Sequence, residues 1–218
     1  MRGIAAVVAV VVGSLCAASV ADPKPKPKPT VQAKAKAKAN DDVQPAKGFW
    51  KVLVKKGAKW TLKETIGDSR RTLTIETYDV RKIGTADVAR LRWTLIGTDG
   101  KKTDAGDTES GRYTQLAVTP EGLYILYAEQ DDARVAQMLK GKPSRSDPPK
   151  AYSGTKQNHG RYLMVRSADY ICMGQGPEPD AGECPDTCDG TLCISATDGP
   201  AELLGNWAPG VSVFEASD

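Results

Sequence analysis

Histidine is scarce in this sequence, and the ligand spacings of the common metal sites are missing. His159 is the single histidine among 218 residues, and no two cysteines form a C-x-x-C pair. Structural zinc sites are built from such pairs and from further Cys or His ligands, so the sequence disfavours zinc. No EF-hand spacing of acidic residues is present, which excludes that calcium-binding loop.

Recognisable catalytic motifs are also lacking. Residues 67–69, Gly-Asp-Ser, match the nucleophile motif of GDSL-type esterases, but a strand is predicted to follow, and His159 has no Asp two or three residues before it. Ser153 and Lys156 match S-x-x-K, a motif that needs its serine at the start of a helix. Here the pair follows two prolines, and no K-T-G comes after it. These patterns favour a turn at 67–69 and loops around Ser153 and His159.

The N-terminus has too short an apolar run to cross a membrane as a helix, which takes about 20 residues. Arg2 is followed by an apolar run over residues 4–12 and by small residues up to Ala21. This order of a basic end, an apolar core and a small-residue cleavage site predicts a signal peptide at 1–21. The alternatives are an uncleaved anchor and a lipid anchor on Cys16, which Leu15 disfavours. We therefore expect a protein that is exported to the periplasm, the cell surface or the medium.

Residues 22–48 contain no aromatic side chain and hold seven lysines against three aspartates, a net charge of +4. Three Lys-Pro steps and three Ala-Lys steps predict an extended, disordered, cationic linker, because proline removes backbone donors and like charges repel. The linker resembles the Lys-Pro spacers of bacterial envelope proteins. Two interpretations remain open: binding to anionic envelope polymers or membrane headgroups, and a solvated spacer. Without aromatic residues for base stacking, nucleic acid is not expected as a partner.

Residues 49–218 are long enough for one domain with a substantial core and carry a net charge of −2. Four cysteines lie within 22 residues of one another: Cys172, Cys184, Cys188 and Cys193. An even number in an exported chain predicts two disulfides. Three pairings are possible. We favour Cys172–Cys193 with Cys184–Cys188, because Cys172 and Cys193 belong to two strand-like runs that could pair.

The domain has few helical signals and many period-two runs. Alternating apolar residues predict strands near 58–66, 71–80, 91–95, 113–118, 123–127, 162–166, 170–173, 192–196 and 211–214. Residues 131–140 form the one clear helix, with Asp131 or Asp132 as its N-cap and Gly141 at its end. The fold class expected is mainly β: a single antiparallel sheet or partly open barrel with one short helix and a disulfide-stabilised late loop.

The start of the domain, FWKVLVKKGAKWTLKE, has an aromatic residue, an aliphatic residue and then G-x-x-W before a strand. These positions are Phe49, Leu53 (or Val54), Gly57 and Trp60. The stretch resembles the opening of uncharacterised bacterial exported or periplasmic antiparallel β-sheet proteins, over about 16 residues. Residues 54–56 depart from that pattern. The resemblance implies an envelope or secreted location and an antiparallel sheet, and it implies no activity.

Two late loops carry opposite charges. The first is a candidate anion-binding loop within 140–161, with Lys140, Lys142, Arg145, Lys150, Lys156 and Arg161. The second, within 174–190, is a candidate Ca²⁺ site with Glu178, Asp180, Glu183, Asp186 and Asp189, on charge density alone. Long loops of this kind are often functional. A surface ion-pair network between the two loops is the third interpretation.

Together these features indicate a non-catalytic envelope or extracellular binding or structural module on a cationic stalk. The alternative is a hydrolase acting on an envelope or extracellular substrate through a site that no motif displays. No cofactor is expected apart from the calcium hypothesis. No feature of the sequence fixes the oligomeric state.

Overall fold

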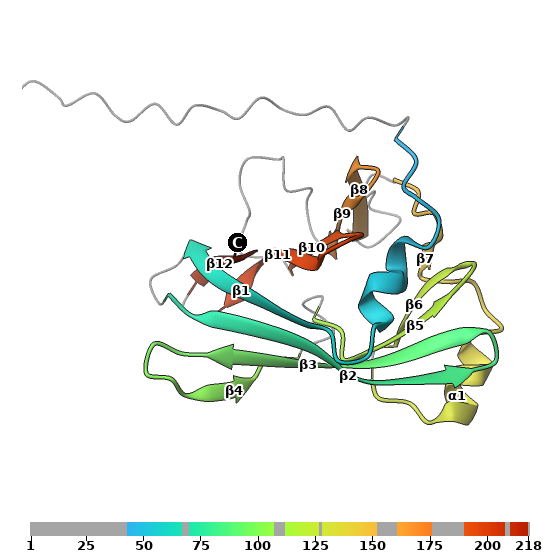
Figure 1. The fold of residues 1–218 in the computed structure, drawn as a ribbon, viewed down its shortest axis with the longest axis horizontal. Helices are drawn as coiled ribbons and strands as arrows, with labels where there is room; N and C mark the ends of the chain where they lie inside the picture. Colours follow the sequence, from blue (N-terminus) through green and yellow to red (C-terminus); the bar gives the residue numbers. More distant parts are fainter. Residues whose placement is uncertain are drawn as a thin grey trace, which may run out of the picture. The chain divides into compact units, whose positions relative to one another are not determined.

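The computed structural model describes residues 43–66, 70–106, 112–126, 128–151, 161–175, 190–207 and 210–217. The elements are η1 (Phe49–Val54), β1 (Lys59–Ile66), β2 (Thr72–Ile83), β3 (Ala86–Ile96), β4 (Lys102–Asp104), β5 (Gln115–Thr119), β6 (Gly122–Leu126), α1 (Asp132–Met138), β7 (Arg145–Ser146), β8 (Arg161–Ser167), β9 (Tyr170–Gln175), β10 (Thr191–Ser195), β11 (Gly199–Trp207) and β12 (Gly210–Ala216) (Figure 1).

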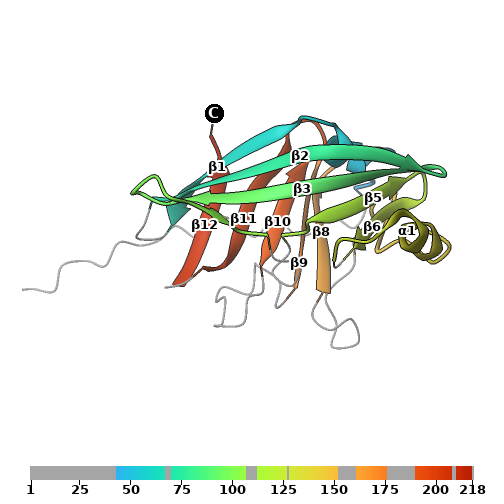
Figure 2. The same ribbon diagram turned by 90° about the horizontal axis from the view of Figure 1, so that it is seen from below.

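The strands form one curled antiparallel sheet, a half-barrel, in the order β7-β6-β5-β3-β2-β1-β12-β11-β10-β9-β8, with β4 paired to β3 (Figures 1 and 2). Strands β1 and β12 join the early and late halves of the chain in the middle of the sheet, where Leu62 lies opposite Ala216. The expected fold class is confirmed, including the mainly β content and the antiparallel pairing.

One face of the sheet forms the main core. In β2, buried Leu73, Ile75 and Thr77 alternate with partly exposed residues, as the period of two requires. The inward residues of the late strands, such as Ile171 and Phe214, belong to the same cluster. Because the sheet curls, side chains from both halves of the chain reach one core.

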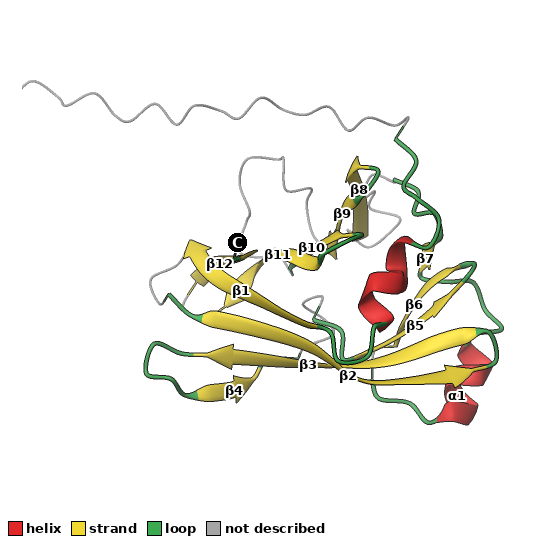
Figure 3. Cartoon of the chain, viewed as in Figure 1, coloured by secondary structure: helices red, strands yellow, loops and turns green. Residues whose placement is uncertain are grey.

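Strands β5 and β6 are buried on both faces. Leu116 and Ile125 face the main core, whereas Ala117 and Leu126 pack with Val135 of α1 in a second cluster. As expected, the carboxylate of Asp131 caps α1 by accepting a hydrogen bond from the Arg134 N–H at 2.8 Å. Helix α1 thus covers the outer face of this part of the sheet (Figure 3). Neither helix in the described ranges is long and apolar enough to span a membrane.

The short helix η1 packs into the main core at the start of the domain. Phe49, Trp50 and Leu53 are each at most 2 % exposed. The Thr77 hydroxyl donates to the Leu53 carbonyl at 3.0 Å and fixes the helix over β2. The preceding residues also lie on the domain, because Val43 packs against the core. Composition assigned residues 43–48 to the linker, and in the structure they are part of the folded surface.

The disulfide Cys172–Cys193 joins β9 to β10, where the two residues lie directly opposite each other. This is the pairing favoured from the two strand-like runs, and it is confirmed. Both residues are at most 1 % exposed. Cys184 and Cys188 lie outside the described residues.

Gly199, the first residue of β11, lies under the indole of Trp60. The last residue of β12, Ala216, pairs with Leu62 of β1. Trp60 lies beyond the end of this pairing, and its side chain contacts Gly199 of β11. A Cβ on Gly199 would come within 2.2 Å of Trp60 Nε1, and the φ of Gly199 is +84°. Glycine is required here for two reasons, a positive φ and a close approach.

We expect Gly199→Ala to lower the free energy of unfolding by about 2–4 kcal/mol, because it adds a steric clash to backbone strain. Gly100→Ala is the matched control: its φ is +77°, and no atom lies within 4 Å of the added Cβ. The control should lose only about 1–2 kcal/mol from strain. Urea unfolding measures the free energy of unfolding of both variants. Equal losses would contradict the prediction, because they would mean that the Trp60 side chain moves away from the added Cβ without an energetic penalty.

Candidate functional site

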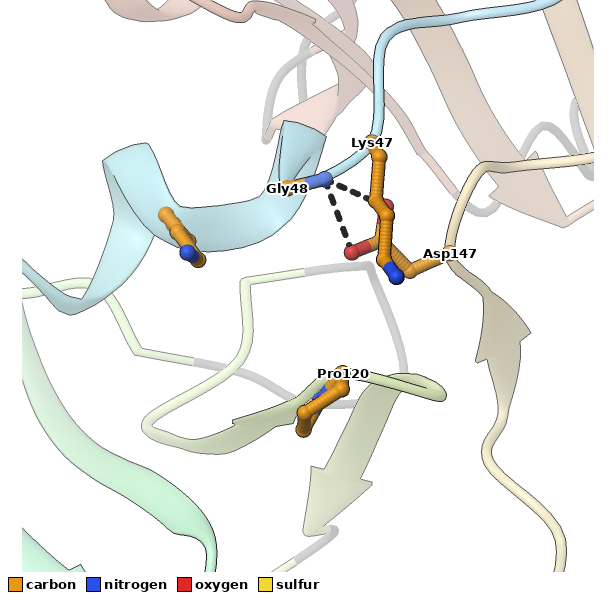
Figure 4. A pocket seen from close by; sticks show the side chains of 5 residues that line it. Lys47, Gly48, Pro120 and Asp147 are labelled. Atoms are coloured by element: carbon orange, nitrogen blue, oxygen red, sulfur yellow. Dashed lines mark hydrogen bonds between the residues drawn. The ribbon is translucent and has the colours of Figure 1, made fainter.

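Three segments that are distant in sequence meet around a cleft of about 410 Å³. Lys47, Gly48 and Lys51 come from the start of η1, Pro120 from the turn between β5 and β6, and Asp147 from the residue after β7 (Figure 4). The cleft therefore lies where the chain enters the folded domain.

Asp147 fastens the chain at this entrance. Its two carboxylate oxygens accept hydrogen bonds from the Gly48 N–H at 3.1 and 2.9 Å. Gly48 has a φ of +85°, a conformation that glycine adopts without steric cost. The Asp147 N–H donates in turn to the Glu121 carbonyl at 3.0 Å. The three walls of the cleft are thus tied to one another through Asp147.

Trp50 adds a second fastening. Its side chain is fully buried, and its Nε1–H donates to the Ser146 carbonyl at 2.9 Å. The rings of Phe49 and Trp50 meet edge to face, with centroids 5.1 Å apart and planes at 79°. Since a buried indole N–H needs an acceptor, the carbonyl of Ser146 determines how η1 sits on the sheet.

The two lysines of the cleft present their charges to solvent. A Cβ on Gly48 would lie 3.4 Å from Lys51 Cδ and 3.8 Å from Lys51 Nζ, so the Lys51 stem is folded back over Gly48. The Lys47 side chain runs beside Asp147 and ends toward Pro120 (Figure 4). Within the described residues, no carboxylate lies within 4.0 Å of either ammonium group.

Glu121, next to Pro120, adds a negative charge at the rim. Interactions with Thr119 and with its own backbone N–H, together with the nearby Lys47 charge, hold the pKa of its carboxyl below the usual value. Glu121 is therefore ionised at neutral pH. The rim combines two ammonium groups with two carboxylates, and the Asp147 carboxylate already accepts the Gly48 N–H.

The lining suits binding of a charged group beside a small apolar surface. Lysine ammonium groups are point charges with three donors each, and they recognise phosphate and carboxylate without a fixed orientation. Pro120 and the lysine stems supply the apolar surface. The site is firmly built, because the Asp147 carboxylate accepts the Gly48 N–H and the Ser146 carbonyl accepts the Trp50 indole N–H.

The structure separates the residues of the candidate anion-binding loop. Lys140, Lys142 and Lys150 are exposed. Arg145 belongs to β7, is only 9 % exposed, and donates from Nη1 to the Ser144 carbonyl at 3.1 Å. Arg161 begins β8, and Lys156 and the Arg161 side chain lie outside the described residues. Arg145 thus contributes packing, and Asp147, the one acid of this loop, is the residue that reaches the cleft.

The candidate calcium residues Glu178, Asp180, Glu183, Asp186 and Asp189 all fall outside the described residues, as do residues 67–69, Ser153 and His159. In the described part of the chain, no three His, Cys, Asp or Glu side chains gather in a way that could hold a metal ion.

Sequence reasoning missed the cleft. Lys47 was counted in the linker, and neither Lys51 nor Pro120 was named as a site residue. Gly48 and Asp147 are 99 positions apart, and no local pattern announces their contact. The one available signal was Asp147 itself, which is the single acid among the basic residues of 140–161 and is followed directly by two prolines.

Comparison with known proteins finds no family model that matches this chain, and no curated protein or solved structure matches it either.

Proposed function

We propose that this chain is an exported bacterial protein that binds anionic polymers of the cell envelope without catalysis. In this proposal the signal peptide at 1–21 directs export, and the cationic linker at 22–48 makes the electrostatic contact. The β domain is the module that the linker attaches to the envelope.

The observation that carries the proposal is the fastening of the linker's end to the domain. Gly48 is held by Asp147, and Trp50 is held by Ser146. These contacts lie beside two lysines that have no ion-pair partner among the described residues. Because the end of this cationic segment is held to the domain by hydrogen bonds, a polymer bound to the segment would be connected firmly to the domain. This favours an attachment role over that of a flexible spacer.

The test is co-sedimentation of residues 22–218 with isolated bacterial envelopes, at low and high salt. The matched control keeps the length of the linker and replaces six of its lysines with glutamine: Lys24, Lys26, Lys28, Lys34, Lys36 and Lys38. We expect the native chain to pellet at low salt and to be released near 1 M salt, where the Debye length falls to about 3 Å. The neutralised chain should stay in the supernatant.

Two outcomes would contradict the proposal. If both chains stay in solution, the linker makes no envelope contact. If both pellet equally and salt releases neither, the attachment belongs to the domain and does not depend on charge.

A further inference from the structure

We propose that the cleft between η1 and the β5–β6 turn binds a phosphate or carboxylate group of an anionic polymer, with Lys47 and Lys51 as its two cationic contacts. This inference rests on the proposed function and deepens it, because it names a site on the folded domain and the chemical group that the site receives.

The first argument is the supply of free donors. Lys47 and Lys51 are both exposed and line the same cleft. Among the described residues, neither ammonium group has a carboxylate within 4.0 Å, and the Asp147 carboxylate accepts the Gly48 N–H instead. Two ammonium groups without an ion pair in the described structure can therefore bind an external anion.

The second argument is position. Gly48 sets the start of η1, and the folded-back Lys51 stem lies against it, so the Lys51 ammonium stays near the cleft. Lys47 is the residue before Gly48, and its side chain points toward Pro120 (Figure 4). A lysine whose stem lies against the domain, as that of Lys51 does, loses less side-chain entropy on binding than a fully solvated lysine, and this favours a defined contact.

The third argument is continuity. Six lysines of the linker precede Lys47 in the sequence, and Lys51 follows it on the domain. A polymer with repeated negative charges can contact the linker and the cleft together, so that each contact raises the effective concentration for the other. A single small anion would gain nothing from the linker.

The neighbouring acid Glu121 makes the inference specific. Its carboxylate lies close enough to Lys47 for their charges to interact. A bound anion must share the rim with this negative charge and with that of Asp147. Replacing Glu121 with glutamine should therefore strengthen anion binding, whereas replacing the lysines should weaken it.

The experiment measures the affinity of residues 22–218 for short-chain polyphosphate and for polyglutamate, with the Gly48 amide resonance as a local reporter. We expect Lys47→Gln/Lys51→Gln to bind polyphosphate roughly tenfold more weakly and Glu121→Gln to bind it about two- to threefold more tightly. Lys55→Gln, an exposed lysine at the other end of η1 and outside the cleft, is the control and should change affinity by less than about twofold.

The two probes separate the sources of the anionic group. If only polyphosphate binds and shifts the Gly48 resonance, the ligand is a phosphate polymer, and if only polyglutamate does so, it is a carboxylate polymer. Either result supports the site. A silent Gly48 resonance with equal losses in Lys55→Gln and the cleft variant would overturn the inference. Envelope binding through the linker could still hold in that case, so the two failures are distinguishable.

Discussion

Replacing Arg71 with methionine is expected to lower the free energy of unfolding at neutral pH by about 3–5 kcal/mol. The reason is Glu64, whose side chain has no exposed surface. Arg71 Nη2 lies 2.6 Å from one Glu64 oxygen, and Arg71 Nε and N–H both donate to the other. Without the guanidinium group, a buried carboxylate loses its main partner.

The dependence of this stability on pH follows from the same contacts. Hydrogen bonds from the Arg71 side chain, opposed by burial and aided by Ser212, lower the pKa of Glu64 from 4.5 to about 2. Between these values the unfolded state binds more protons than the folded state, so stability rises with pH. The pair contributes on the order of 3 kcal/mol above pH 4.5, and the contribution is lost as the pH falls toward 2.

Urea unfolding between pH 2 and pH 7 tests both statements. Arg71→Met should lose most of the rise in stability between pH 2 and pH 4.5. The double variant Glu64→Leu/Arg71→Met should recover much of the loss at neutral pH, because it buries no unpaired charge. An Arg71→Met variant that keeps the native slope would show that Glu64 is not the group that titrates.

Trp50→Ala is the second large effect, with an expected loss of about 3–5 kcal/mol. The indole is fully buried, packs against Phe49, and provides one of the two fastenings at the entrance of the domain. Removing it leaves a cavity and an unpaired Ser146 carbonyl. We also expect faster hydrogen exchange at the Gly48 amide, since the contact with Asp147 depends on the position of η1.

Trp50→Phe separates packing from hydrogen bonding. It keeps most of the apolar volume and removes only the Nε1–H donor, so we expect a loss of about 1–2 kcal/mol. Thermal unfolding and amide exchange measure the two variants side by side. If Trp50→Ala costs less than about 1 kcal/mol, η1 does not hold the linker's end to the sheet.

Local patterns predicted the parts of the fold that local physics determines. Alternation placed Leu73 and Ile75 on one face of a strand, and Asp131 was recognisable as a helix cap. The pairing of Cys172 with Cys193 followed from two strand-like runs that the structure shows as neighbours. Each of these features depends on side chains close in sequence or on two adjacent strands.

Strand β11 was missed because its first residues argue against a strand. Gly199 and Pro200 are typical of turns, yet Pro200 lies beside a register shift in the β10–β11 pairing, where proline is tolerated. The burial of Glu64 was also missed. It lies on the face of β1 that Leu62 defines, and its carboxylate is paired with Arg71, the residue before β2.

The cleft could not be predicted because it depends on long-range contacts. The Gly48–Asp147 hydrogen bonds form only once the sheet has brought the β5–β6 turn and β7 together. Composition showed that the linker is cationic, but it gave no sign that two lysines would sit on a fixed surface at its end.

The salt dependence of envelope binding by residues 22–218 tests the central claim most directly. We predict that the pelleted fraction falls steeply as the salt rises from about 0.05 M to about 0.5 M, because screening weakens every lysine contact. A pelleted fraction that does not change over this range would contradict an electrostatic attachment to the envelope.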